Sequence, residues 1–355
     1  MKKNLKIHLM KGNRIALNWL YLILILSVLS SCQKTKYQWE PGISAPKYYP
    51  VGGKISFGNA GNGSNIAFDS GWGKEYGGVV SGSKCKEIPK DVYIDYYSVV
   101  DSKDFKGKVF LDQKKILDLF RKYNINDNNF AHLVVGMAPG GWIRVWFTTI
   151  DKQIEVAKAQ LKGYKNDNVG LGLKTKDFKT WGSSYTYWQH HGIPYEAWAN
   201  NEKEYYYDIK FVTQNKDAKL DRSYVVSADG WYSSFYTEKL SEDINDVSNK
   251  GSKGKIPVHL SVSWQDKSTG TYYDTNIVMP KTLKRLFDET YQANDKLAYS
   301  NFIIELENDK QHAVVYLKTK DKVIKLLRFK GEISSKDKQD FGDYAYAEEI
   351  ECFIP

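Results

Sequence analysis

The sequence lacks the short motifs that usually disclose a catalytic or metal-binding chemistry. It contains no serine-nucleophile elbow, no HExxH zinc motif and no calcium-binding loop in EF-hand order. The asparagine-rich stretch at residues 124–129 has the composition of a calcium loop without its order, and we interpret it as the turn that ends a helix. Short motifs in the sequence therefore indicate no reaction and no ligand.

A concentrated basic surface is missing as well. The formal net charge is +9, but five cations precede the apolar N-terminal run with no acid among them: Lys2, Lys3, Lys6, Lys11 and Arg14. The rest of the chain carries a net charge of +4, spread over more than three hundred residues. A charge this dilute aids solubility and does not form a phosphate-binding stripe, so we expect no nucleic-acid partner.

The longest apolar run is short. Residues 21–29 are almost wholly apolar, whereas a membrane-spanning helix needs about 20 such residues. Cations before the run and small residues after it are typical of a secretory signal peptide, which we assign to residues 1–31. Residues 32–36 then form a tether to the folded part.

The end of this signal, Leu29-Ser30-Ser31-Cys32, resembles the lipobox of bacterial lipoproteins. The resemblance implies that Cys32 becomes the first mature residue and anchors the chain through its acyl groups. Gln33 in place of aspartate implies the outer membrane, and the lack of an acidic run after Cys32 favours its periplasmic face. An ordinary secretory signal with an unrelated cysteine is the alternative.

Two further cysteines remain once Cys32 is acylated. Cys85 and Cys352 are an even pair in an oxidising compartment, which makes them a disulfide candidate. Spacing alone does not show that they meet, so two free, partly buried thiols are the alternative.

The chain repeats itself at an offset of about 167 residues. Each copy opens with Ile-Pro and a strand of alternating apolar residues, continues through a second strand into an amphipathic helix, and then forms a hairpin. Asp112 is the expected N-cap of the first helix, and Pro280 suits the first turn of the second. The repeat predicts an α+β fold of two tandem modules, 37–165 and 204–355, each a mainly antiparallel sheet covered by one helix.

An aromatic-rich segment, 166–203, separates the two modules. It contains the stretch TWGSSYTYWQHHGIPYEAW, which has too many aromatic residues for a free linker. We therefore expect it to pack on one module or between the two.

The first module resembles a family of uncharacterised bacterial lipoproteins, domain of unknown function 2931. The resemblance is carried by Tyr37-Gln38-Trp39, the stretch SAPKYYP at 44–50, Gly71-Trp72-Gly73, and the stretch GMAPGGW at 136–142. It covers the second module only in its hydrophobic pattern. It implies location and architecture, with no catalytic residues to carry over.

The small-residue loop of this stretch is the most motif-like feature of the chain. A phosphate-cradling loop leads from a strand into a helix, whereas this one leads into a strand, so we interpret it as a hairpin connection. Trp142, Arg144 and Trp146 share one face of that strand. If exposed beside the loop, they would form a partner-binding surface, whose candidate residues are Gly136, Met137, Ala138, Pro139, Gly140, Gly141, Trp142, Arg144 and Trp146. The alternative is that the aromatic segment buries this row.

Two other chemistries are weaker hypotheses. His190, His191 and Glu196 contain metal-ligating groups, but neighbouring histidines point apart on a strand and the spacing matches no zinc motif, so we predict no metal and no cofactor. Acidic pairs such as Glu348 and Glu349, or Glu305 and Glu307, would suit a glycosidase only at a fixed separation that the sequence does not give.

Three classes of function remain open. A non-catalytic envelope lipoprotein that binds a protein partner, including a toxin that it neutralises, is the first hypothesis. A structural component of the envelope is the second, and a hydrolase acting on glycan or peptidoglycan is the third. The first requires an exposed apolar patch, and the third requires a cleft with two carboxylates in different environments.

Overall fold

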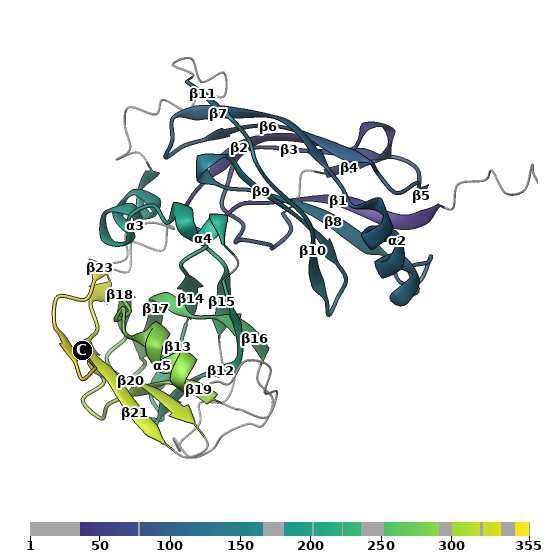
Figure 1. Ribbon diagram of the computed structural model, residues 1–355. Coiled ribbons are helices and arrows are strands. Elements are labelled where there is room, and N and C mark those ends of the chain that lie inside the picture. The colour runs from purple at the N-terminus through teal and green to yellow at the C-terminus, as the bar shows by residue number, and fades with distance from the viewer. Residues whose placement is uncertain are drawn as a thin grey trace, which may run out of the picture.

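The computed structural model describes residues 36–76, 79–165, 181–200, 202–221, 223–235, 252–290, 300–319, 322–334 and 345–354. They form two β-rich modules with two short helices between them (Figure 1). Most strand pairs are antiparallel and helices are few, so the predicted α+β class is confirmed. Cys32 and the predicted signal peptide lie outside the described residues. No helix in the described ranges has both the length and the apolar character to cross a membrane.

The first module contains two sheets. Their orders are β10-β9-β8-β1-β5 and β11-β7-β6-β2-β3-β4. The elements are β1 (Tyr37–Ser44), β2 (Val51–Ser56), η1 (Gly58–Ala60), β3 (Gly61–Phe68), β4 (Val79–Ser81), β5 (Cys85–Lys86), β6 (Asp91–Ser98), β7 (Lys103–Phe110), α2 (Gln113–Lys122), β8 (Ala131–Met137), η2 (Pro139–Gly141), β9 (Trp142–Thr148), β10 (Gln153–Gln160) and β11 (Gly163–Lys165).

The second module also contains two sheets, in the orders β16-β12-β19-β20-β21-β24 and β15-β14-β17-β18-β22. Its elements are β12 (Glu204–Thr213), β13 (Ala218–Leu220), β14 (Ser223–Ser227), β15 (Tyr232–Phe235), β16 (Ser252–Lys255), β17 (Pro257–Asp266), β18 (Thr271–Val278), α5 (Leu283–Thr290), β19 (Ser300–Leu306), β20 (His312–Thr319), β21 (Val323–Lys330), β22 (Ile333–Ser334), β23 (Ala345–Tyr346) and β24 (Ile350–Cys352).

The two modules share one topology. The order β10-β9-β8-β1-β5 corresponds to β21-β20-β19-β12-β16, and β7-β6-β2-β3 corresponds to β18-β17-β14-β15. In both modules the first strand pairs in parallel with the strand after the helix, β1 with β8 and β12 with β19. A repeat of sequence pattern is thus accompanied by a repeat of strand order.

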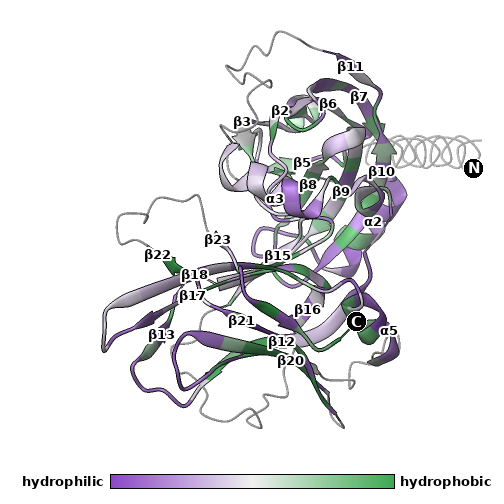
Figure 2. Ribbon diagram, turned by 90° about the vertical axis from the view of Figure 1, so that its left-hand side faces the viewer, coloured by the Kyte–Doolittle hydropathy of each residue, from purple (hydrophilic) through white to green (hydrophobic). Residues whose placement is uncertain are grey.

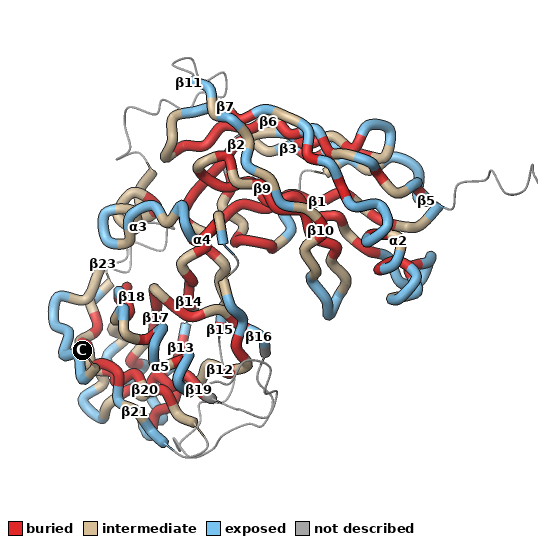
Figure 3. Tube along the Cα trace, viewed as in Figure 1, coloured by how far each residue is buried: buried red, intermediate tan, exposed pale blue. Residues whose placement is uncertain are grey.

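Each module has two sheets where we predicted one. Val92 and Ile94 of β6 and Ile143 and Val145 of β9 belong to one buried cluster, although their strands lie in different sheets. Buried and exposed residues alternate along each strand because one face of the strand packs against the opposite sheet. In Figure 3 the central strands β1, β8 and β9 are mostly buried. Period-two alternation shows which face is buried and does not show which hairpins share a sheet.

Helix α2 follows its sequence signals closely. The side chain of Asp112 accepts a hydrogen bond from the backbone N–H of Lys115 at 2.9 Å, which is the predicted N-cap. Its apolar side includes Phe120, whose ring lies 5.0 Å from Tyr37 and 5.7 Å from Phe147. Figure 2 shows hydrophobic and hydrophilic stretches on this helix. The helix packs at one end of the sheet that contains β1 and β9.

The connecting segment forms helices α3 (Ser183–His191) and α4 (Tyr195–Ala199), which lie between the modules (Figure 1). Its Tyr187 and Trp198 are 2% and 0% exposed. They join a buried cluster with Tyr49 of the first module and Val226 of the second. The two modules and the connecting helices therefore share one hydrophobic contact region.

Candidate functional site

The small-residue loop is buried, so its predicted surface position is wrong. Met137 and Ala138 are fully buried, and Pro139 and Gly141 are also buried. Gly140 and Gly141 have φ values of 76° and 82°, which agrees with a turn that needs glycine. A side chain on Gly141 would come within 2.2 Å of the backbone oxygen of Leu161. The small residues allow the chain itself to pack closely here.

The row Trp142, Arg144 and Trp146 is covered in the same way. Arg144 is 2% exposed, forms an ion pair with Glu155 and donates a hydrogen bond to the backbone oxygen of Trp198 at 3.1 Å. Trp146 is 7% exposed, and only Trp142 is partly open. The exposed surface that the binding hypothesis required is not present, because the connecting helices cover this face of β9. Gly136 is buried against the ring of Trp146.

Backbone groups and aromatic side chains hold the modules together. The backbone oxygen of Gly230 accepts hydrogen bonds from the N–H groups of Lys47 and Trp72, each at 2.9 Å. The hydroxyl oxygens of Tyr48 and Tyr224 lie 2.5 Å apart across the same boundary. A defined contact thus joins the modules, and the surface around it is a candidate for function.

A pair of histidines lies in this contact. The sequence placed His190 and His191 on a strand, but they end helix α3, which stops at the C-cap Gly192, whose φ is 69°. Nε2 of His191 lies 3.2 Å from Nδ1 of His259, which is on β17. The ring of His190 stacks on Tyr346 at 3.7 Å instead. The two neighbouring histidines therefore have different partners.

Burial keeps the paired imidazoles neutral. Burial, with a smaller contribution from His190, lowers the pKa of His191 from 6.5 to about 4. Burial also lowers the pKa of His259 well below its ordinary value, with His191 adding to the effect. One neutral ring donates its N–H to the other, so the hydrogen bond between α3 and the second module exists at neutral pH.

A pocket opens beside this pair where the two modules and α3 meet. Its volume is about 210 Å³. The lining residues come from the first module, the connecting helices, and the β17, β18 and α5 region: Tyr49, Tyr187, His190, His191, Pro194, Ala228, Ile256, Pro257, Val258, Val278, Met279, Pro280, Lys281, Leu283 and Lys284. Most are apolar, and Val278 is 39% exposed at the rim. A pocket at a module boundary is a usual place for a ligand.

The pocket carries two lysines that form no direct ion pair with any described residue. Lys281 and Lys284 are both exposed, and neither forms an ion pair with another residue in the described part of the chain. Elsewhere in the contact region, Lys255 pairs with the buried carboxylate of Asp229. The pocket therefore combines apolar walls with two exposed lysines at its edge.

The disulfide prediction is not supported. Cys85 on β5 and Cys352 on β24 are both free and exposed. They belong to different modules, where β5 and β24 are edge strands of two separate sheets. The expectation that free thiols would be partly buried is also wrong.

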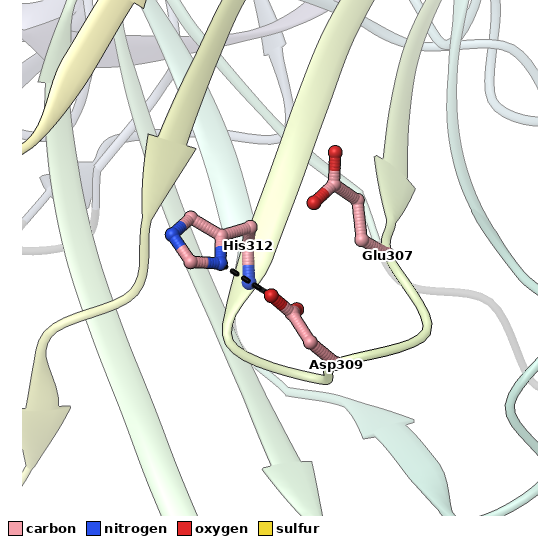
Figure 4. A group of neighbouring side chains, drawn as sticks. All are labelled: Glu307, Asp309 and His312. Atoms are coloured by element: carbon pink, nitrogen blue, oxygen red, sulfur yellow. Dashed lines mark hydrogen bonds and ion pairs between the residues drawn. The ribbon is translucent and has the colours of Figure 1, made fainter.

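One group of metal-ligating side chains occurs in the second module, at the turn between β19 and β20. The group comprises Glu307, Asp309 and His312 (Figure 4). Both carboxylate oxygens of Glu307 accept hydrogen bonds from Arg328, at 2.9 and 2.7 Å. Oδ2 of Asp309 lies 2.5 Å from Nδ1 of His312, and its Oδ1 accepts hydrogen bonds from the backbone N–H groups of Gln311 and His312. The side chains of Asp309 and His312 are therefore engaged in hydrogen bonds within the turn, and that of Glu307 is engaged in an ion pair.

One member of each acidic pair considered for a hydrolase forms an ion pair, Glu307 with Arg328 and Glu349 with Lys330. The hydrogen bond from Arg328 lowers the pKa of Glu307, and that from Lys330 lowers the pKa of Glu349. A general acid needs a carboxyl whose pKa is raised. Neither Glu307 nor Glu349 therefore has the raised pKa of a general acid.

The sequence did not identify His259 or the pocket. His259 belongs to an alternating strand pattern, which predicts only that β17 is half-buried. Its partner lies 68 residues away, and no local signal reports such a contact. The one available signal was the excess of aromatic and histidine residues in the connecting segment.

Comparison with known proteins bears on the first half of the chain. A search of curated proteins gave no match, and a search of solved structures gave none either. The resemblance inferred from the sequence is confirmed for the first module: residues 29–196 match the model of the family described as "Protein of unknown function (DUF2931)".

Proposed function

We propose that this chain is a lipid-anchored protein of the bacterial envelope that binds a protein partner and catalyses no reaction. The N-terminal cations, the short apolar run and the lipobox-like end at Cys32 support the anchor. Gln33 supports delivery to the outer membrane, with the body on the periplasmic side. A toxin neutralised in the envelope is one partner of this kind.

The observation that carries the binding function is the pocket between the modules. It is lined by the apolar residue Val278, which is 39% exposed. Protein partners often insert one side chain into such a pocket and surround it with weaker contacts. The proposed binding surface thus moves from the buried Trp142–Trp146 row to the module boundary.

A test of the anchor uses Cys32→Ala. The variant is expected to remain unprocessed or to leave the membrane fraction, and globomycin treatment of wild type is expected to leave an unprocessed form. Membrane fractionation and the mass of the N-terminal peptide measure this. Unchanged processing and fractionation would contradict the lipoprotein assignment.

A test of binding uses site-specific photocrosslinking in cells. The crosslinker p-benzoylphenylalanine is placed at position 278, on the pocket rim, and in a matched strain at position 150, a fully exposed site in the hairpin after β9. We expect a discrete crosslinked species at position 278 and none at position 150. The same pattern at both positions, or no species at either, would remove the support for a binding pocket.

A further inference from the structure

The size of the pocket restricts what it can hold. Binding sites for small molecules commonly measure about 300–1,000 Å³. This pocket has a volume of about 210 Å³, which suits one large side chain better than a whole cofactor or lipid tail. An anchor of this size is what a protein partner inserts at the centre of an interface.

The walls indicate that the inserted group is apolar. Val258, Met279 and Leu283 line the pocket from the second module, and Tyr49 lines it from the first. The hydroxyl of Tyr49 donates to the backbone oxygen of Gly192 at 2.7 Å, so its polar atom is already satisfied. An apolar or aromatic side chain can fill this space without losing a hydrogen bond.

The rim indicates the charge of the residues beside that anchor. Lys281 and Lys284 lie at the pocket without an ion pair to any described residue. Two carboxyls act on Lys284 only at longer range. Asp288, also on α5, is ion-paired with Lys203 and accepts a hydrogen bond from Tyr205. The other is Glu202, and burial raises the pKa of its carboxyl. Burial also keeps His191 neutral at pH 7, so the two lysines supply the charge at this rim. Acidic groups on a partner would complement them.

We propose that the pocket captures an acidic segment of a partner protein, with one large apolar side chain in the pocket and carboxylates beside Lys281 and Lys284. This inference rests on the proposed binding function and specifies the chemistry of the partner. The lysines give orientation and a salt-sensitive association rate, and the apolar anchor gives the larger share of the affinity.

The experiment uses the whole chain without its signal peptide and with Cys32→Ser. Its binding to an array of random short peptides is measured. Wild type is expected to select peptides that combine acidic residues with an aromatic or large aliphatic residue. The charge reversal Lys281→Glu with Lys284→Glu should lower affinity for these peptides at least tenfold and shift selection to basic peptides. The matched control, Lys219→Glu with Lys267→Glu, changes the same charge on exposed lysines outside the pocket lining.

A second variant separates the proposal from the proposed function. Val278→Trp places a large side chain at the rim, so it should abolish selection of all peptides while the thermal unfolding temperature stays unchanged. If peptide binding is lost in Val278→Trp but unchanged by Lys281→Glu with Lys284→Glu, the acidic chemistry of the partner is refuted and the binding pocket is still supported. No peptide binding by wild type would overturn both. Binding of dodecanoate in place of peptides, or dimerisation blocked by Val278→Trp, would assign another occupant and overturn the acidic-segment proposal.

Discussion

Acid is expected to separate the two modules through the paired histidines. Nε2 of His191 lies 3.2 Å from Nδ1 of His259, and the ring of Tyr187 stacks on His191 at 4.0 Å. Tyr48 and Tyr346 also face the pair. Burial raises the pKa of all three tyrosines, so these side chains remain neutral and offer no negative charge to a protonated imidazole.

The direction and size of the effect follow from the lowered pKa values. Undocking returns the imidazole to water, where its pKa is about 6.5. Between pH 6.5 and about 4 the undocked state therefore binds more protons, so docking weakens as the pH falls; above pH 6.5 both states are neutral and the pH has no effect. For His191 alone, a pKa of about 4 gives a loss of about 3 kcal/mol by pH 4, roughly a hundredfold in the docking equilibrium. His259 adds to this loss.

The two free cysteines allow this to be measured. Cys85 and Cys352 are exposed and lie in different modules, so a donor and an acceptor dye can be attached to them in the Cys32→Ser chain. Energy transfer should change between pH 6.5 and 4 before either module unfolds, as judged by far-UV circular dichroism. In the double variant His191→Gln and His259→Gln the change should be reduced or lost. A variant with the same pH profile as wild type would refute the role of the pair.

Two substitutions test the buried loop and its neighbouring row. Arg144→Ala leaves the carboxylate of Glu155 and the backbone oxygen of Trp198 without their partner, so the free energy of unfolding measured in urea should fall by about 3 kcal/mol; a change below a few tenths would contradict the buried position. Gly136→Ala would place a methyl group 2.5 Å from the ring of Trp146, so we expect a loss of about 1–3 kcal/mol, and an unchanged unfolding temperature would show that the packing is looser than described.

The local structure was predictable because its causes are local. The alternation in β6 and β9, the cap at Asp112 and the helix-ending turn at 124–129 each follow from neighbouring residues. The even spacing of matching segments also predicted a repeat, and the strand orders of the two modules correspond. Periodicity records which side of an element is buried, and here it did so correctly.

The site was not predictable because its causes are non-local. The alternation of apolar residues in β9 is the same whether the outer face of this strand is exposed to water or covered by another part of the chain. Trp142, Arg144 and Trp146 have the composition of an interface in either case, and only the position of Trp198 decides between them. Residues enriched in binding surfaces are therefore also the residues that hold two modules of one chain together.

The position of the connecting helices changes where the first module should be considered to end. Residues 37–165 were predicted as a unit, but the family match extends to residue 196, within α4. Helices α3 and α4 cover the outer face of β9, and the backbone oxygen of Trp198 accepts from Arg144. A fragment that ends at residue 165 would expose this face and leave Arg144 with one partner fewer.

We therefore expect a fragment of residues 33–200 to be more stable than one of residues 33–165. Both lack the second module, so the comparison isolates the connecting helices. In the longer fragment Tyr49 keeps its hydrogen bond to the backbone oxygen of Gly192 and its edge contact with Trp198, whose ring lies 5.0 Å away. Calorimetry should give a higher unfolding temperature for 33–200, and Arg144→Ala should lower it more there than in 33–165. Equal temperatures would mean that the connecting helices are held in place by the second module and belong with it, whatever the extent of the family match.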